Sequence, residues 1–147
     1  MRPVTIHRLL LLTLMSAIIV SCSNGQPSST LSQWGTSLEQ IRSAVAAAGK
    51  YPLEAVEVTA SPSLLRITVS DLNLAQADQL TRENSANSIV SAAEGVISQQ
   101  QIFTSVQAIN VAIMHPERAE GSAAQTHTED VLEFRKGPNK RFAHHIT

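Results

Sequence analysis

The chain has 147 residues, a formal net charge of −1 and an aromatic content of 3%. That length supports one hydrophobic core, and the near-neutral charge argues against a nucleic-acid partner. With so few aromatic rings the core must be aliphatic, and an aromatic platform for stacking bases or sugars is not expected.

Residues 1–21 have the composition of a secretory signal segment. Arg2 and Arg8 precede the apolar run 9–20. That run is followed by Ser21 and by Cys22, the single cysteine of the chain. As a helix this run would be about 18 Å long, shorter than the roughly 30 Å hydrocarbon core of a bilayer. The pattern therefore favours a cleaved signal over a transmembrane anchor, and it leaves no cysteine for a disulfide.

The sequence Ile19-Val20-Ser21-Cys22 resembles the lipobox of bacterial lipoproteins, with Ile19 where that family usually has Leu. The resemblance implies that Cys22 is acylated and becomes the first residue of the mature protein. Ser23 at the next position, rather than Asp, implies the outer membrane and its periplasmic face. Two or more acyl chains anchor a protein stably, whereas one does not. The alternative is an ordinary secretory signal that ends in a chance cysteine.

The mature chain is expected to have two parts. Residues 22–36 would comprise the lipidated cysteine and a flexible tether, because the stretch 23–32 is rich in Ser with Gly and Pro and lacks an apolar period. Residues 37–147 would form one small periplasmic domain, whose folded part begins near Leu38. Removal of residues 1–21 takes away two basic residues and no acid, so this domain is mildly acidic.

The first expected element is a helix that ends at Gly49. Ser37 is a suitable N-cap, with Gln40 as its reciprocal partner. Apolar residues recur at helical spacing in this segment: Leu38, Ile41, Val45 and Ala48. Pro52 prevents the helix from continuing.

Two strands, 54–59 and 65–70, are expected next. The turn residues 60–63 between them predict a hairpin. Leu65, Ile67 and Val69 would face the core. Arg66, Thr68 and Ser70 would lie on the opposite, open face, as antiparallel sheets allow.

A long helix from Leu74 to Phe103 follows, with Asn73 as its N-cap and Gly95 as a position where it breaks. Its expected apolar stripe consists of Leu80, Ala86, Ile89, Val90, Ala93, Val96 and Ile97. A third strand, Val106 to Met114, would direct Ile109, Val111 and Ile113 inward and Ala108, Asn110 and Ala112 outward. His115 and Pro116 would end this strand.

After a loop at 117–126, segments 130–135 and 141–145 predict a terminal hairpin in which Leu132 and Phe134 face Phe142. The expected fold class is therefore α+β. Two helices would pack on one face of a mainly antiparallel sheet, in the order α-β-β-α-β followed by the C-terminal hairpin.

The order helix–strand–strand–helix–strand between Leu38 and Met114 is similar to the BON modules of bacterial envelope proteins, including Glu94-Gly95-Val96 before the last strand. That resemblance implies phospholipid or membrane binding. The sequence departs from the BON pattern at Ser61-Pro62-Ser63, where a glycine-led turn is expected, and in the length of the second helix.

The histidines, acids and serines of the chain do not form a recognisable catalytic set. His144 and His145 are adjacent on a strand and point to opposite sides, so they cannot easily share one metal ion. His144 would need partners from a distant element, and no ligand spacing with His115 or His127 provides them. The acids near the terminal hairpin, Glu129, Asp130 and Glu133, are explained better as salt-bridge partners than as paired catalytic carboxylates. The serines lack a nucleophile elbow. No metal and no cofactor is expected.

One dense basic patch remains, formed by Arg135, Lys136, Lys140 and Arg141 beside Phe134 and Phe142. It could contact anionic headgroups or an acidic partner. The alternative is a charged strand edge that prevents pairing with other chains.

The leading hypothesis is a non-enzymatic, lipid-anchored lipoprotein of the bacterial envelope that binds another envelope component, most simply an envelope protein. A BON-like module that contacts phospholipid directly is the alternative. A small envelope hydrolase that uses the acids of the terminal hairpin is a third hypothesis.

Overall fold

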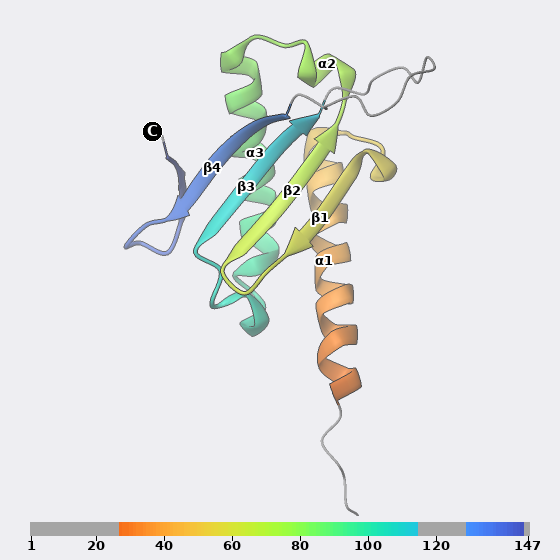
Figure 1. Ribbon diagram of the computed structural model, residues 1–147, viewed down its shortest axis with the longest axis vertical. Helices are drawn as coiled ribbons and strands as arrows, with labels where there is room; N and C mark the ends of the chain where they lie inside the picture. The colour runs from red at the N-terminus through yellow and green to blue at the C-terminus, as the bar shows by residue number, and fades with distance from the viewer. Residues whose placement is uncertain (1–26, 115–128, 146–147) are drawn as a thin grey trace, which may run out of the picture.

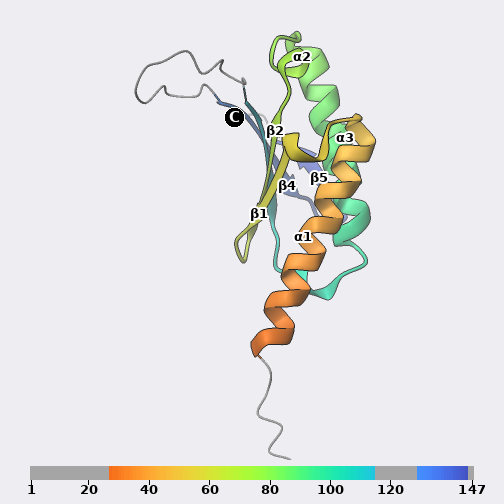
Figure 2. The ribbon, with the colours of Figure 1, turned by 90° about the vertical axis from the view of Figure 1, so that its right-hand side faces the viewer.

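Helices α1 and α3 pack side by side on one face of a β-sheet, and the opposite face of the sheet is left open (Figures 1 and 2). The computed structural model describes residues 27–114 and 129–145. In chain order, its elements are α1 (Pro27–Gly49), η1 (Leu53–Ala55), β1 (Val56–Ala60), β2 (Leu64–Ser70), α2 (Leu72–Ala75), α3 (Gln79–Ile97), η2 (Gln101–Phe103), β3 (Ala108–Met114), β4 (Glu129–Lys136) and β5 (Phe142–His144). The predicted α+β class is confirmed.

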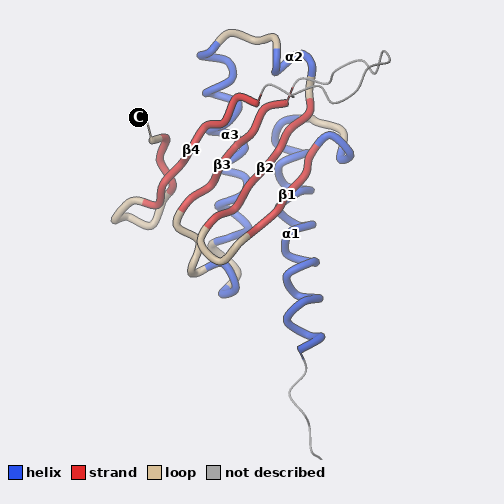
Figure 3. Tube along the Cα trace, in the orientation of Figure 1, coloured by secondary structure: helices blue, strands red, loops and turns tan. Residues whose placement is uncertain are grey.

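The described strands lie in the order β1-β2-β3-β4-β5, so neighbours in sequence are neighbours in the sheet (Figure 3). Three of the pairings are antiparallel, and the central pairing of β2 with β3 is parallel. A parallel pair needs a crossover connection, which α2 and α3 supply here. Both the predicted first hairpin and the predicted terminal hairpin are present.

The strand register agrees with the alternation in the sequence. Six residues expected to face the helices are fully or almost fully buried: Leu65, Ile67, Val69, Ile109, Val111 and Ile113. Their neighbours Arg66, Thr68, Ser70 and Asn110 lie on the open face. Ala112, which was expected to lie outside, is on the open face but is buried there, in register with Thr68 on one side and Val131 on the other. A methyl group between two larger side chains leaves no surface for water.

The prediction that residues 22–36 form a flexible tether is wrong for residues 27–36, because α1 begins at Pro27. Ser37 is not an N-cap but a helical residue with 4% of its surface exposed. The indole of Trp34 packs edge-to-face on Phe103, with the ring centroids 5.2 Å apart. In proteins such tertiary packing stabilises helical turns whose residues have only modest helix propensity.

The helix α1 ends at Gly49 as predicted, although Lys50 is the residue with the left-handed backbone (φ 56°). The Tyr51 N–H donates to the Ala46 carbonyl oxygen at 2.9 Å, and the Lys50 N–H donates to that of Ala47. This pair of bonds is a Schellman motif. A side chain at Gly49 would overlap the Tyr51 ring, so the glycine is required for close approach. Ala46, rather than the predicted Ala48, faces the core.

The single helix expected from Leu74 to Phe103 is in fact two helices and a 3-10 turn. Asp71 caps α2 by accepting from the Leu74 N–H at 2.8 Å, and Asp78 caps α3 by accepting from the Thr81 N–H at 2.7 Å. The latter bond holds the pKa of Asp78 below its usual range.

The other details expected of this helix also change. Asn73 lies inside α2 rather than at its cap, and Gly95 lies inside α3 without breaking it. Leu80, expected in the apolar stripe, is 67% exposed because α3 has only just begun at that position.

Cys22, His115, Pro116 and the loop predicted at 117–126 lie outside the described residues. Among the helices of residues 27–114, none combines the length and apolarity that a membrane span requires.

The register predicts unequal effects of one charge at two adjacent positions in β2. Val69→Asp places an unpaired carboxylate in the core and should lower the free energy of unfolding by several kcal/mol, about 3 or more. Thr68→Asp, on the open face, should cost less than about 1 kcal/mol. Urea unfolding followed by circular dichroism measures both values. Equal losses would contradict the register.

Candidate functional site

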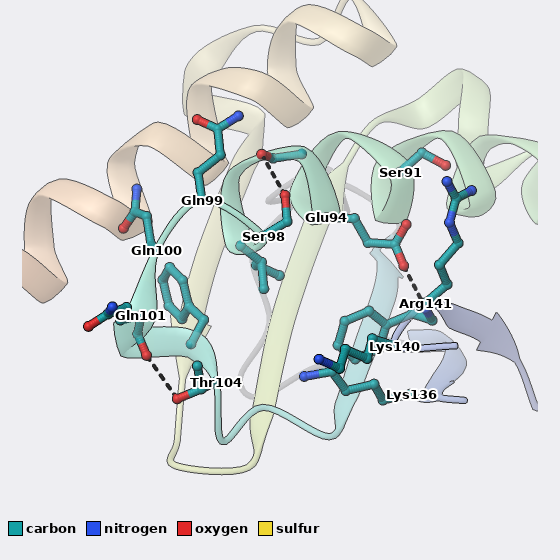
Figure 4. A pocket seen from close by; sticks show the side chains of 14 residues that line it. Ser91, Glu94, Ser98, Gln99, Gln100, Gln101, Thr104, Lys136, Lys140 and Arg141 are labelled. Carbon is teal, nitrogen blue, oxygen red and sulfur yellow. Dashed lines mark hydrogen bonds between the residues drawn. The ribbon is translucent and has the colours of Figure 1, made fainter. Parts of the chain in front are cut away.

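A groove of about 840 Å³ lies between the C-terminal end of α3, the turn η2 and the tip of the β4–β5 hairpin (Figure 4). Its apolar floor is formed by Ile97, Phe103 and Phe142. One side carries cations from the hairpin, and the other carries amide and hydroxyl groups from η2 and the residues before it. We call this the basic groove.

Three cations of the hairpin line the basic groove, namely Lys136, Lys140 and Arg141. Lys136 comes from the end of β4, where it lies 5.8 Å above the Phe142 ring and donates to the Val106 carbonyl oxygen at 3.2 Å. Lys140 follows the turn in a left-handed conformation (φ 63°) and is exposed, as is Arg141. The hairpin thus fixes one ammonium group and presents two further cations to solvent.

Glu94 of α3 is the acid among the lining residues, and it is already engaged by the backbone. Its Oε1 accepts a hydrogen bond of 2.5 Å from the Phe142 N–H, 48 positions away in sequence. Figure 4 shows the carboxyl group directed at the start of β5. A carboxylate that accepts a backbone N–H satisfies that donor and holds the hairpin against α3. The three cations therefore outnumber the acid in the groove.

The opposite side of the groove consists of uncharged polar groups: Ser98, Gln99, Gln100, Gln101 and Thr104. The hydroxyl groups of Ser98 and Thr104 are used in local bonds to backbone carbonyls, and the Gln100 side chain donates to Gln40 Oε1 of α1 at 2.5 Å. The Gln99 and Gln101 amides are exposed. This combination of cations with amide donors and acceptors suits an anionic ligand that also forms neutral hydrogen bonds.

The structure separates Arg135 from the rest of the predicted patch. Successive residues of a strand point to opposite faces, so Arg135 lies on the open face while Lys136 lines the basic groove. Its Nε donates to Glu133 Oε1 at 2.6 Å. That bond holds the pKa of Glu133 below its usual range. The prediction of four neighbouring cations is therefore wrong for Arg135.

The histidines of the terminal hairpin are placed apart, as the alternation of a strand requires. His144 packs on the Phe134 ring with a centroid separation of 5.2 Å. His145 follows β5, and its backbone N–H donates to the Glu133 carbonyl oxygen. In the part of the chain that the structure describes, no three His, Cys, Asp or Glu side chains are arranged to hold a metal ion. His127, like His115, lies outside that part.

Two of the three acids near the hairpin have basic partners. Asp130 lies 3.2 Å from Arg82 of α3, a residue distant in sequence, and Glu133 pairs with Arg135. The side chain of Glu129 is not among those described. For Asp130 and Glu133 the salt-bridge interpretation agrees with the structure.

The sequence alone did not indicate that Glu94 and residues 98–101, 103 and 104 line the groove. No local pattern marks them, because they meet the hairpin only through the fold. The three neighbouring amides at 99–101 were the signal that the sequence offered on this side.

Comparison with protein-family models, with curated proteins and with solved structures gives no match to this chain. The fold and the basic groove define a two-layer α+β domain with a cationic site at one end.

The bond between Glu94 and Phe142 should contribute measurably to stability. Glu94→Ala leaves a partly buried N–H without its acceptor and should lower the free energy of unfolding by about 1–3 kcal/mol. Glu94→Gln keeps an oxygen acceptor and should cost less than the alanine variant. Urea unfolding gives the two free energies, and hydrogen exchange of the Phe142 amide reports on the hairpin. A glutamine variant as unstable as the alanine variant would show that the charge, not the bond, matters.

Proposed function

We propose that this protein is a lipid-anchored lipoprotein of the bacterial cell envelope whose basic groove binds an anionic component of that envelope. The convergence of Lys136, Lys140 and Arg141 on one groove carries the proposal. Among the described residues that line the groove Glu94 is the one acid, and it is bound to the hairpin backbone. Cations that lack acidic partners in a groove attract and retain anionic groups.

The proposed activity is binding and not catalysis. The acids Asp130 and Glu133, which a hydrolase would need as free carboxylates, are engaged with Arg82 and Arg135. The groove has cations on one side and amide groups on the other, and both kinds of group can bind a ligand by hydrogen bonds and charge. These contacts support a binding domain.

The proposed location is the periplasmic face of the outer membrane. It is supported by the lipobox resemblance at residues 19–22, by Ser23 after the cysteine, and by the apolar run 9–20, whose length suits a signal segment. Acylation of Cys22 would anchor the protein without a spanning helix.

Attachment through Cys22 is tested by Cys22→Ala. The variant, made with an ordinary cleaved secretory signal in place of residues 1–21, should move from the membrane pellet to the soluble fraction at physiological salt, because it loses its acyl chains. Fractionation followed by immunoblotting measures this, with Ser23→Ala as the control that keeps the cysteine. A Cys22→Ala protein that pellets as completely as the wild type would contradict the lipoprotein assignment.

The role of the basic groove is tested with the purified Cys22→Ala protein added to washed envelope membranes. Weak binding is expected at low salt, and it should decline as the screening length falls below about 10 Å. Introducing Lys140→Glu and Arg141→Glu together into this protein should abolish membrane binding, since both exposed cations are reversed. Introducing Arg135→Glu instead, on the open face, should leave most of the binding intact. Sedimentation at several salt concentrations gives the bound fraction. Equal binding by all these variants would contradict the assignment of the groove.

A further inference from the structure

We propose that the basic groove docks on the anionic headgroups of the same membrane that holds the Cys22 anchor, so that the lipid and the hairpin together fix the orientation of the domain. This inference rests on the proposed function and names the anionic component as the membrane surface. The parts of the structure that carry it are the direction of α1, the reach of the chain and the distribution of charge.

The anchor and the basic groove belong to the same end of the domain. The N-terminal half of α1 runs toward the end where α3 finishes and the β4–β5 turn lies (Figures 1 and 2). Trp34 of α1 contacts Phe103, which lines the groove. The strand register also brings Ala60, Leu64 and Lys136 to this end. The membrane anchor is thus attached on the groove side.

The chain between the anchor and the groove is short enough for contact. From Trp34 back to Pro27 the helix extends about 10 Å, and residues 22–26 add at most about 17 Å even when fully extended. Trp34, which contacts the groove residue Phe103, is therefore held within roughly 30 Å of the acylated cysteine. A tether of this length keeps the local concentration of headgroups at the hairpin high, so each contact can be weak.

The charges of the domain are distributed along the same axis. The segments at the groove end, 27–38, 61–64 and 98–108, contain no charged residue. Lys136, Lys140 and Arg141 are added to that neutral surface by the hairpin. The opposite end carries the start of α3, the end of β2 and the start of β4. Its acids Glu54, Asp71, Asp78, Glu83 and Asp130 outnumber its cations Arg42, Lys50 and Arg82, so this end has a small net negative charge. An anionic membrane would attract the first end and repel the second.

The strength expected of this contact is modest. Each Lys or Arg near an anionic surface strengthens binding roughly fivefold. The two exposed cations, Lys140 and Arg141, would therefore change the population of docked domains about 25-fold when both contact the surface. That is insufficient for attachment by itself and sufficient to orient a domain already held by lipid.

The test measures which end of the lipidated protein lies at the bilayer. Cys22 is the single cysteine and its sulfur would carry the anchor, so a substituted cysteine takes a fluorophore uniquely. Ser105→Cys labels an exposed position at the groove end, and Asn73→Cys labels an exposed position on α2 at the opposite end. The full lipidated chain is placed in vesicles that contain a headgroup spin label as quencher, with either phosphatidylglycerol or only phosphatidylcholine.

Quenching at position 105 should exceed quenching at position 73 at least threefold in the phosphatidylglycerol vesicles. The difference should shrink in phosphatidylcholine, at high salt, and in the Lys140→Glu/Arg141→Glu variant, which the lipid still keeps on the vesicle. Equal quenching at the two positions in phosphatidylglycerol overturns the inference. It is also overturned if the charge-reversed variant is quenched as strongly as the unreversed protein at position 105, because the anchor alone, and not the basic groove, would then set the orientation.

Mass spectrometry of the N-terminal peptide separates this failure from failure of the proposed function. Acyl chains on Cys22 with equal quenching contradict the docking alone. A Cys22 without acyl chains overturns the anchor and the docking together.

Discussion

The parallel pairing of β2 with β3 is the constraint on which the rest of the structure depends. Antiparallel neighbours can be joined by a tight turn, but parallel neighbours need a connection that returns the chain to the starting end of the sheet. Here that connection is α3, which runs back along the sheet and finishes at Ile97 beside the start of β3. The position of the basic groove follows, because its uncharged side is the end of this crossover.

The physical character of the groove comes from how few of its charges are paired. Glu94 is bound to a backbone donor rather than to a cation, and Lys136 is bound to a backbone carbonyl and an aromatic ring. Neither residue neutralises the other. On the open face the opposite holds, since Arg135 and Glu133 neutralise one another across a distance of 2.6 Å. In β4, the cation on the open face, Arg135, is therefore paired with an acid, whereas the cation in the groove, Lys136, is not.

The sequence predicted those features that depend on neighbouring residues. Alternation identified the inward side chains of β2 and β3, and the dense cations of the terminal hairpin were recognised as a surface feature. Arg135 and Lys136 are successive residues of a strand, so their side chains must point to opposite faces of the sheet. Their proximity in sequence nevertheless suggested a single patch. The end of α1 at Gly49 was marked by local chemistry that a single sequence displays.

Features that depend on the fold were not visible in this way. The helix α1 begins at Pro27, and its residue Trp34 packs on Phe103, a partner distant in sequence that no residue near Trp34 reveals. Two aspartates, Asp71 and Asp78, divided what the apolar period presented as one helix. Glu94 could be assigned a role only after the fold had brought Phe142 to it.

The helical form of residues 27–36 has a mechanical consequence. A flexible tether absorbs a pull by extending, whereas a helix transmits it along its axis. Tension at the N-terminal end of α1 therefore enters the domain as shear between α1 and the layer beneath it, where Ile41 and Val45 are fully buried. In this shear geometry, the contacts of Ile41 and Val45 resist the force at the same time and do not break in sequence. A force applied at the N-terminal end of α1 is therefore resisted by the hydrophobic core of the domain.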